Sequence, residues 1–145
     1  AIEDRKGHPY LYSILFCALA RSQDIPARPV AGYLIDRDLQ ATRHYWAEFY
    51  IETVGWIPVD PILGEGKIRV SIPPEVDPYT YYFGNLDFNH LALSKGLIEL
   101  NQLDPQGRIV MRTDIPSLQG IHEEATGALS SYNVYWSDLE VLGIY

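Results

Sequence analysis

The pattern of hydrophobic and polar positions predicts one long helix near the start of the chain. Residues 9–22 are apolar nearly all round, which is typical of a buried central helix rather than a surface helix. Pro9 suits the first helical position, because the N–H that proline lacks has no helical partner there. Pro26 prevents the helix from continuing much further. We therefore expect a buried helix over residues 9–22.

Three strands are expected after this helix. Residues 28–35 are rich in β-forming side chains, and residues 56–59 follow a tight hairpin connection at 52–55. Residues 43–51 alternate well enough for the two faces of this strand to be assigned. One face carries His44, Trp46, Glu48 and Tyr50, and the other carries Tyr45, Ala47, Phe49 and Ile51. The order of these elements predicts antiparallel neighbours in one sheet.

The second half of the chain has a weaker pattern. Prolines and glycines between residues 61 and 78 predict a long surface loop with one short strand at 68–71, and the aromatic residues of 79–84 are expected to pack on the core. Further short strands are expected at 90–94, 108–112 and 131–141. The pattern predicts an α+β fold, in which a central buried helix packs on an antiparallel sheet. The 145 residues suit one domain, spanning 1–145.

Composition and charge narrow the function classes. The net charge is −8, from 11 basic and 19 acidic residues, whereas nucleic-acid binding needs a basic face. The longest apolar run, Ile14 to Ala20, is far shorter than the ~20 residues that span a membrane. The single cysteine, Cys17, excludes an internal disulfide and a zinc site built from several thiolates. We expect no nucleic-acid partner and no membrane span, and the composition leaves the cellular location open.

Three motifs in the first half of the chain carry the candidate chemistry. Residues 6–9 read Lys-Gly-His-Pro at the helix entry, and residues 25–28 read Ile-Pro-Ala-Arg after it. Residues 44–50 read His-Tyr-Trp-Ala-Glu-Phe-Tyr, and residues 55–61 read Gly-Trp-Ile-Pro-Val-Asp-Pro. Together, over residues 6–61, they resemble the transglutaminase-like superfamily of papain-like fold. Residues 82–87 also resemble, more weakly, a segment of bacterial members of this superfamily.

The resemblance implies a cysteine hydrolase or acyltransferase that needs no cofactor or metal. In that family a cysteine at the helix N-terminus attacks a peptide or amide carbonyl, and the helix end favours its thiolate. A histidine takes the proton, and an aspartate holds the imidazole in the required orientation. Water or an amine then resolves the thioester. The motifs carry the histidine over to His44 and the aspartate to Asp60.

The nucleophile does not carry over. Alignment on Arg21 and residues 25–28 without gaps places the catalytic cysteine at Pro9, which has no nucleophilic atom. Cys17 lies eight positions later, which is ~12 Å along the helix axis and ~80° around it. A small buried core thiol is the simpler interpretation of Cys17. The chain is therefore expected to be either a natural pseudoenzyme or a sequence altered at the nucleophile position.

Other candidate residues have weaker signals. His8 lies beside the vacant nucleophile position, and His8 and Trp46 are the candidates for substrate binding, although a helix cap and a core residue are the simpler interpretations. A zinc site from His8, His44 and a carboxylate has no recognised ligand spacing, so no metal is expected. Glu48 is expected to bind Arg28 or another base. His90 and His122 have no evident partner in the sequence.

Three functions therefore stay open. The first is a binding module for peptide or glycan-linked ligands on an inactive scaffold. The second is an active cysteine hydrolase or amidase, and the third is a structural interaction domain in which His44 and Asp60 only support the fold. Family members usually carry upstream helices that cover the cleft, so we expect this chain to be the core and C-terminal part of a larger protein. The sequence does not identify the substrate, the oxyanion donors or the oligomeric state.

Overall fold

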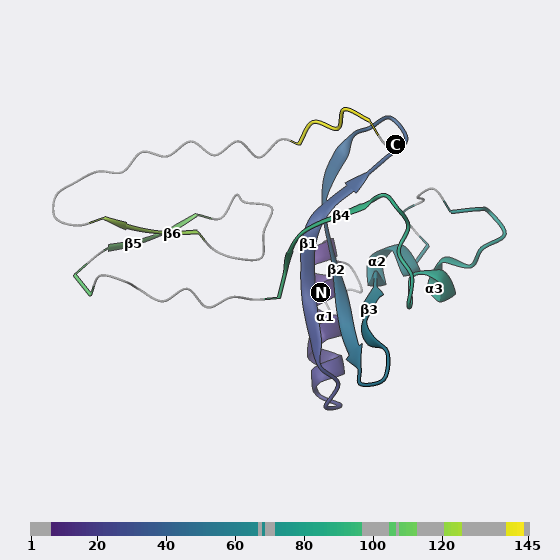
Figure 1. Cartoon of the computed structure of the whole chain (residues 1–145), viewed down its shortest axis with the longest axis horizontal. Helices are drawn as coiled ribbons and strands as arrows, with labels where there is room; N and C mark the ends of the chain where they lie inside the picture. The colour runs from purple at the N-terminus through teal and green to yellow at the C-terminus, as the bar shows by residue number, and fades with distance from the viewer. Residues whose placement is uncertain are drawn as a thin grey trace.

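A computed structural model describes residues 7–66, 68, 72–96, 105–106, 108–112, 121–125 and 139–143. A four-stranded antiparallel sheet in the order β3-β2-β1-β4 carries helix α1 along one face, and β5 and β6 form a separate pair (Figure 1). The elements are α1 (Pro9–Arg21), β1 (Ala27–Ile35), β2 (Ala41–Ile51), β3 (Gly55–Val59), α2 (Pro61–Gly64), α3 (Pro78–Tyr81), β4 (His90–Lys95), β5 (Arg108–Arg112) and β6 (Ile121–Ala125). The predicted α+β class and antiparallel sheet are confirmed.

Helix α1 begins where the sequence predicts. Pro9 occupies the first helical position, and the Nδ1 atom of His8 accepts a hydrogen bond from the Tyr10 N–H at 3.4 Å. At the other end, the Nε atom of Arg21 donates to the carbonyl oxygen of Ala27 at 2.9 Å, which fixes the turn into β1. None of the helices within the described parts of the chain is both long enough and apolar enough to span a membrane.

The helix buries one face rather than its whole circumference. Its buried residues are Ser13 and Cys17, which lie four positions apart and so share a face. Leu11, Leu15 and Leu19 repeat at the same spacing on the other side and are exposed. Apolar residues on all sides of α1 therefore do not predict that the whole helix is buried, because the sheet covers only one side of it.

Small side chains let α1 approach the sheet closely. The core between helix and sheet contains Cys17 together with Ala27, Ala47 and Val59, one from each of the first three strands. Phe16 and Phe49 pack against this cluster. Since side chains alternate along a strand, His44, Trp46 and Glu48 lie on the opposite face of β2, and all three are buried there. The predicted assignment of these side chains to the two faces of β2 is thus confirmed.

The region between residues 61 and 78 differs from the long surface loop that the sequence predicts. It contains α2 and the start of α3, and Ile62 and Leu63 are buried against Tyr82. Both short helices begin at an Asp-Pro pair: Asp60 caps α2, and Asp77 caps α3 by accepting from the Thr80 N–H. Aspartate at the cap followed by proline is a helix-start signal. In this chain it outweighs the general association of proline with loops.

Other expectations for the second half meet mixed outcomes. The strands at 90–94 and 108–112 exist as β4 and β5, and β6 was not predicted. The aromatic segment is only partly buried, since Tyr82 is 1% exposed whereas Tyr79 is 75% exposed. The expected strand at 68–71 lies outside the described residues except for Ile68, which is a bend. The expected strand at 131–141 is described only at 139–141, which are not in a strand.

Gly32 brings β4 close to β1. The pairing of β1 with β4 has an irregularity between Ala31 and Gly32, where Gly32 pairs with His44 on one side and Ala92 on the other. A Cβ atom at Gly32 would overlap the carbonyl oxygen of Leu91, which is backbone and cannot swing away. The lack of a side chain also leaves space over β1, and the rings of His44 and His90 approach to 5.7 Å between centroids.

The first prediction concerns this glycine. Gly32→Ala should lower the free energy of unfolding by about 1–3 kcal/mol, because β4 must move to relieve the overlap. Urea unfolding of the two proteins measures the difference. Gly64→Ala is the matched control, because its Cβ would meet nothing closer than 3.9 Å, and it should change stability by no more than ~0.5 kcal/mol. Equal effects of the two substitutions would contradict the packing described here.

Candidate functional site

The fold brings together His44 and Asp60, the two residues that the sequence singles out for acid–base chemistry. His44 lies in the middle of β2 and is 4% exposed, whereas Asp60 follows β3 and is fully buried. The Nε2 atom of His44 donates to the Asp60 Oδ2 atom at 2.5 Å. The Nδ1 atom of His44 has no hydrogen-bond partner among the described residues. This imidazole is therefore oriented through one nitrogen and leaves the other uncommitted.

Asp60 is held on every side by hydrogen bonds. Its N–H donates to the carbonyl oxygen of Tyr82, and its Oδ1 atom accepts from the N–H groups of Ile62 and Leu63 at 3.2 and 3.0 Å. The two carboxylate oxygens thus have different partners: Oδ1 caps α2 and Oδ2 faces the histidines. Burial alone would raise the pKa of Asp60, but the hydrogen bonds from His44 and His90 outweigh it and lower that pKa.

His90 is the main correction to the sequence analysis, which found no partner for it. Its Nε2 atom lies 3.1 Å from Asp60 Oδ2, and its Nδ1 atom lies 2.7 Å from Asp87 Oδ1. The hydroxyl of Tyr82 donates to the other oxygen of Asp87 at 2.6 Å. Burial would lower the pKa of His90, but the two carboxylates raise it to about 9. His90 is therefore a cation at neutral pH, placed between two carboxylates.

Trp46 packs against both histidine rings. Its ring stacks on His44 with centroids 6.2 Å apart and meets His90 edge-on at 5.1 Å. The side chain is 1% exposed, and its indole N–H has no hydrogen-bond partner within the described part of the chain. In this position Trp46 forms a wall of the site and fixes the separation of the two imidazoles. Contact between Trp46 and a substrate stays a prediction.

Glu48 ties together the three strands that carry the site. It accepts from Arg28 Nε on β1 at 2.8 Å and from Lys95 Nζ on β4 at 2.7 Å. The expected pairing of Glu48 with Arg28 is confirmed, and Lys95 is a second partner. The guanidinium of Arg28 also lies 3.9 Å above the ring of Trp56, which adds a cation–π contact. These contacts help to hold β4, and with it His90, in register beside β1.

The first turn of α1 lies against Tyr45, the residue that follows His44 in β2 and points to the helix side of the sheet. The rings of His8 and Tyr10 pack on Tyr45, with centroids 6.0 and 5.5 Å apart. Pro9 lies between these two residues at the first helical position and is partly buried. His8 itself is exposed and caps the helix, as in the simpler of its two interpretations. The place that the resemblance gives to a nucleophile is thus held by a saturated pyrrolidine ring.

Cys17 lies elsewhere, in the core between α1 and the sheet. It is 3% exposed and packs with Ala27, Ala47 and Val59. Burial raises the pKa of its thiol to about 11, although the nearby Arg21 partly opposes the shift. A buried thiol with such a pKa is a poor nucleophile at neutral pH, because the thiolate is the reactive form.

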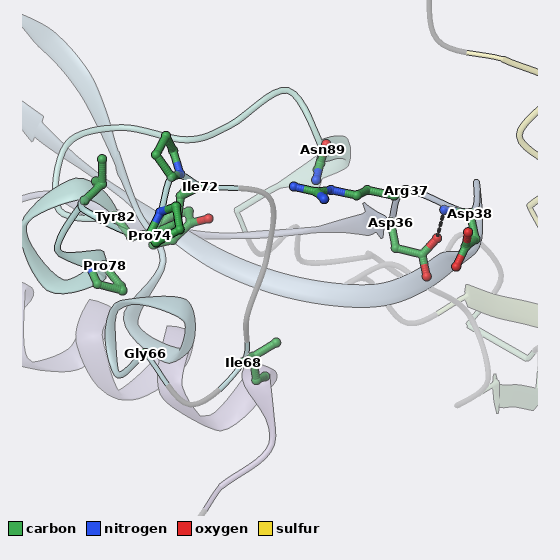
Figure 2. A pocket seen from close by; sticks show the side chains of 12 residues that line it. Asp36, Arg37, Asp38, Gly66, Ile68, Ile72, Pro74, Pro78, Tyr82 and Asn89 are labelled. Atoms are coloured by element: carbon green, nitrogen blue, oxygen red, sulfur yellow. Dashed lines mark hydrogen bonds between the residues drawn. The ribbon is translucent and has the colours of Figure 1, made fainter.

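A cavity of about 700 Å³ has both charged and apolar lining residues, and none of His44, Asp60 and His90 is among them (Figure 2). Tyr82, which binds Asp87, and Asn89, the neighbour of His90, form part of its wall. Figure 2 shows Arg37 extending its guanidinium toward Asn89. The remaining wall consists of Asp36, Asp38, Gly66, Ile68, Ile72, Pro73, Pro74, Val76 and Pro78. The cavity therefore combines a stiff apolar wall with a polar end.

Comparison with known proteins agrees with the motifs. Residues 1–61 match the sequence profile of the transglutaminase-like superfamily, so this part of the chain is similar to that superfamily. Neither the curated proteins nor the solved structures contain a significant match to the chain. The matched segment includes α1 and the first three strands, and it ends directly after Asp60. His90, Asp87 and the cavity-lining residues beyond residue 61 lie outside the match.

The sequence gives little indication of the three site residues that the sequence analysis did not assign, Tyr82, Asp87 and His90. Tyr82 and Asp87 begin and end the segment of weaker resemblance at 82–87, but nothing there assigned them a role. His90 stands three positions after Asp87, a spacing that is common by chance. Its approach to His44 depends on β4 pairing with β1, which is a contact between segments about sixty residues apart in sequence. Only the three-dimensional fold brings these groups together.

The second prediction concerns Cys17. In the folded protein, iodoacetamide at pH 7.5 should label Cys17 slowly, because the thiol is buried and its pKa is raised to about 11. Mass spectrometry of folded and urea-unfolded samples measures the two rates. The unfolded chain should react at the rate of a free cysteine with a pKa near ~8.5. Rapid labelling of the folded protein would show that the helix register is different.

Proposed function

We propose that this chain is a catalytically impaired transglutaminase-like domain that binds peptide or glycan-linked ligands without turning them over. Two observations support the proposal: Pro9 stands at the helix entry, where the family resemblance places the nucleophilic cysteine, and the His44–Asp60 pair is intact. The pair has the arrangement that a cysteine hydrolase needs for its base and orienting acid. The attacking atom is missing from this arrangement.

Loss of the nucleophile stops the reaction at its first step. Acyl transfer begins when a thiolate bonds to the carbonyl carbon while His44 holds the thiol proton, and the amine then leaves with that proton. Pro9 offers neither a thiol nor an N–H, and Cys17 is buried in the core on the sheet side of α1. With no thioester formed, a bound amide is retained unchanged. The retained scaffold then acts through binding.

The cavity supports a peptide-like ligand. Its wall of prolines and aliphatic side chains suits an extended chain, and its polar end carries Arg37 and Asn89. Peptide amides are also the substrate class that the family resemblance implies. The ligand class proposed for the impaired domain is therefore the substrate class of its active relatives.

The third prediction tests the missing nucleophile directly by P9C. The introduced thiol would lie at the start of α1, where the helix end favours the thiolate, and under the proposal His44 would accept the thiol proton. Its apparent pKa, measured from the pH dependence of alkylation, should fall below the ~8.5 of a free thiol and rise again in P9C/H44Q. Wild-type protein should hydrolyse no fluorogenic peptide amide above the rate of buffer alone.

Two outcomes would overturn this part of the proposal. Wild-type turnover that disappears in His44→Gln would make the protein an active enzyme. An unshifted thiol in folded P9C, unaffected by His44→Gln, would mean that position 9 does not face the His44–Asp60 pair.

The fourth prediction tests ligand binding. A fluorescein-labelled N-glycosylated peptide, and the same peptide without its glycan, should bind the wild-type chain saturably in fluorescence anisotropy. Arg37→Ala should weaken this binding by about three- to tenfold through loss of donors at the polar end of the cavity. Arg43→Ala removes a similar charge from the exposed surface of β2 outside the cavity and is the matched control. No saturable binding of either peptide, or equal effects of the two variants, would contradict a binding role for this cavity.

A further inference from the structure

We propose that His44, Asp60 and His90 form a binding site for one divalent transition-metal ion of the zinc type. The ligand atoms are the Nε2 atoms of the two histidines and the Oδ2 atom of Asp60. The inference goes beyond the proposed function, because it requires neither the cavity nor the identity of residue 9.

The three atoms already converge. They lie within 4.8 Å of one another, and Asp60 Oδ2 is 2.5 Å from one imidazole nitrogen and 3.1 Å from the other. Tetrahedral zinc, bound at ~2.0–2.1 Å, keeps its ligand atoms about 3.3 Å apart. The site therefore needs to open by less than an ångström at the His44–Asp60 contact. The three residues are carried by β2, β4 and the start of α2.

The surroundings of the three residues are those of a metal site. Metal-bound histidines usually donate their second ring N–H to a carboxylate, and Asp87 accepts from His90 Nδ1 in this way. Tyr82 in turn donates to Asp87. The Oδ1 atom of Asp60 is occupied by two backbone N–H groups, so only Oδ2 is available and Asp60 would bind through one oxygen.

Charge also favours a cation here. Asp60 and Asp87 place two carboxylates among side chains that are almost fully buried, and two neutral imidazoles would leave their negative charge unbalanced. A divalent ion between the three ligand atoms would supply this compensation.

The donor set indicates which ions fit. Two imidazole nitrogens and one carboxylate oxygen suit zinc, cobalt or nickel, whereas magnesium and calcium prefer oxygen donors alone. Three protein ligands leave a fourth position for water or a ligand, as in zinc sites that are not purely structural. Tyr82 lines the cavity, and its ring lies 6.1 Å from that of His90.

The experiment uses the whole chain, stripped of metal with EDTA and dialysed. Titration with ZnCl2 in a calorimeter should give one ion per chain. His90→Asn removes the ligand atom while its amide can still reach Asp87, and it should weaken binding by at least about tenfold. Asp87→Asn alters only the outer partner and should weaken binding by about 10- to 100-fold. The controls His8→Asn and His122→Asn should leave the affinity unchanged.

A second measurement needs no variant and so does not depend on folding of the mutants. Long-range 15N–1H spectra of the histidines should show zinc shifting the Nε2 signals of His44 and His90 and leaving those of His8 in place. Absence of saturable binding by Zn2+ and Co2+ would overturn the proposal. So would full affinity in folded His90→Asn, or shifts confined to His8. Failure here is distinguishable from failure of the proposed function, which is read from the P9C thiol and from peptide binding.

Discussion

The buried carboxylate of Asp60 is the constraint on which the rest of the site depends. It cannot lie in the core as an anion without partners, and each partner comes from a different element: His44 from β2, His90 from β4, and two backbone N–H groups from α2. Its own N–H is bound by Tyr82, just after α3. The hydrogen-bonding needs of this single side chain therefore fix how the sheet, two short helices and the edge strand meet.

The two faces of the sheet have different environments because side chains alternate along β2. One face presents Ala47 to the helix and builds a dry core around Cys17. The other presents His44, Trp46 and Glu48 to the charged groups of β1 and β4. The only thiol of the chain thus lies on the side of the sheet that excludes water, whereas the imidazoles and carboxylates lie on the other. This separation explains why the presence of a cysteine and a histidine in one domain does not by itself make a catalytic pair.

Local patterns predict the first half of this fold well, and the second half much less. The sequence predicts α1 and the first three strands because each of their signals involves only a few neighbouring residues. These signals are the alternation in β2, the tight turn into β3 and the proline at the start of α1. His44 and Asp60 could be paired because their motifs are similar to a family. The short helices were missed because an Asp-Pro start was interpreted as a loop. His90 and Asp87 could not be predicted, because their approach to Asp60 depends on long-range pairing of β4 and on the absence of a side chain at Gly32.

Pro9 also has a consequence for the unfolded chain. A proline whose ring matches the backbone of the first helical turn restricts the unfolded ensemble and so favours folding by about 0.4–1 kcal/mol. A cysteine at that position would offer no such gain, and a nucleophile there would need to stay accessible to solvent. Under the proposed function, proline in place of a nucleophile gives up reactivity and gains thermodynamic stability at one residue. The helix entry of such a domain contributes to folding rather than to catalysis.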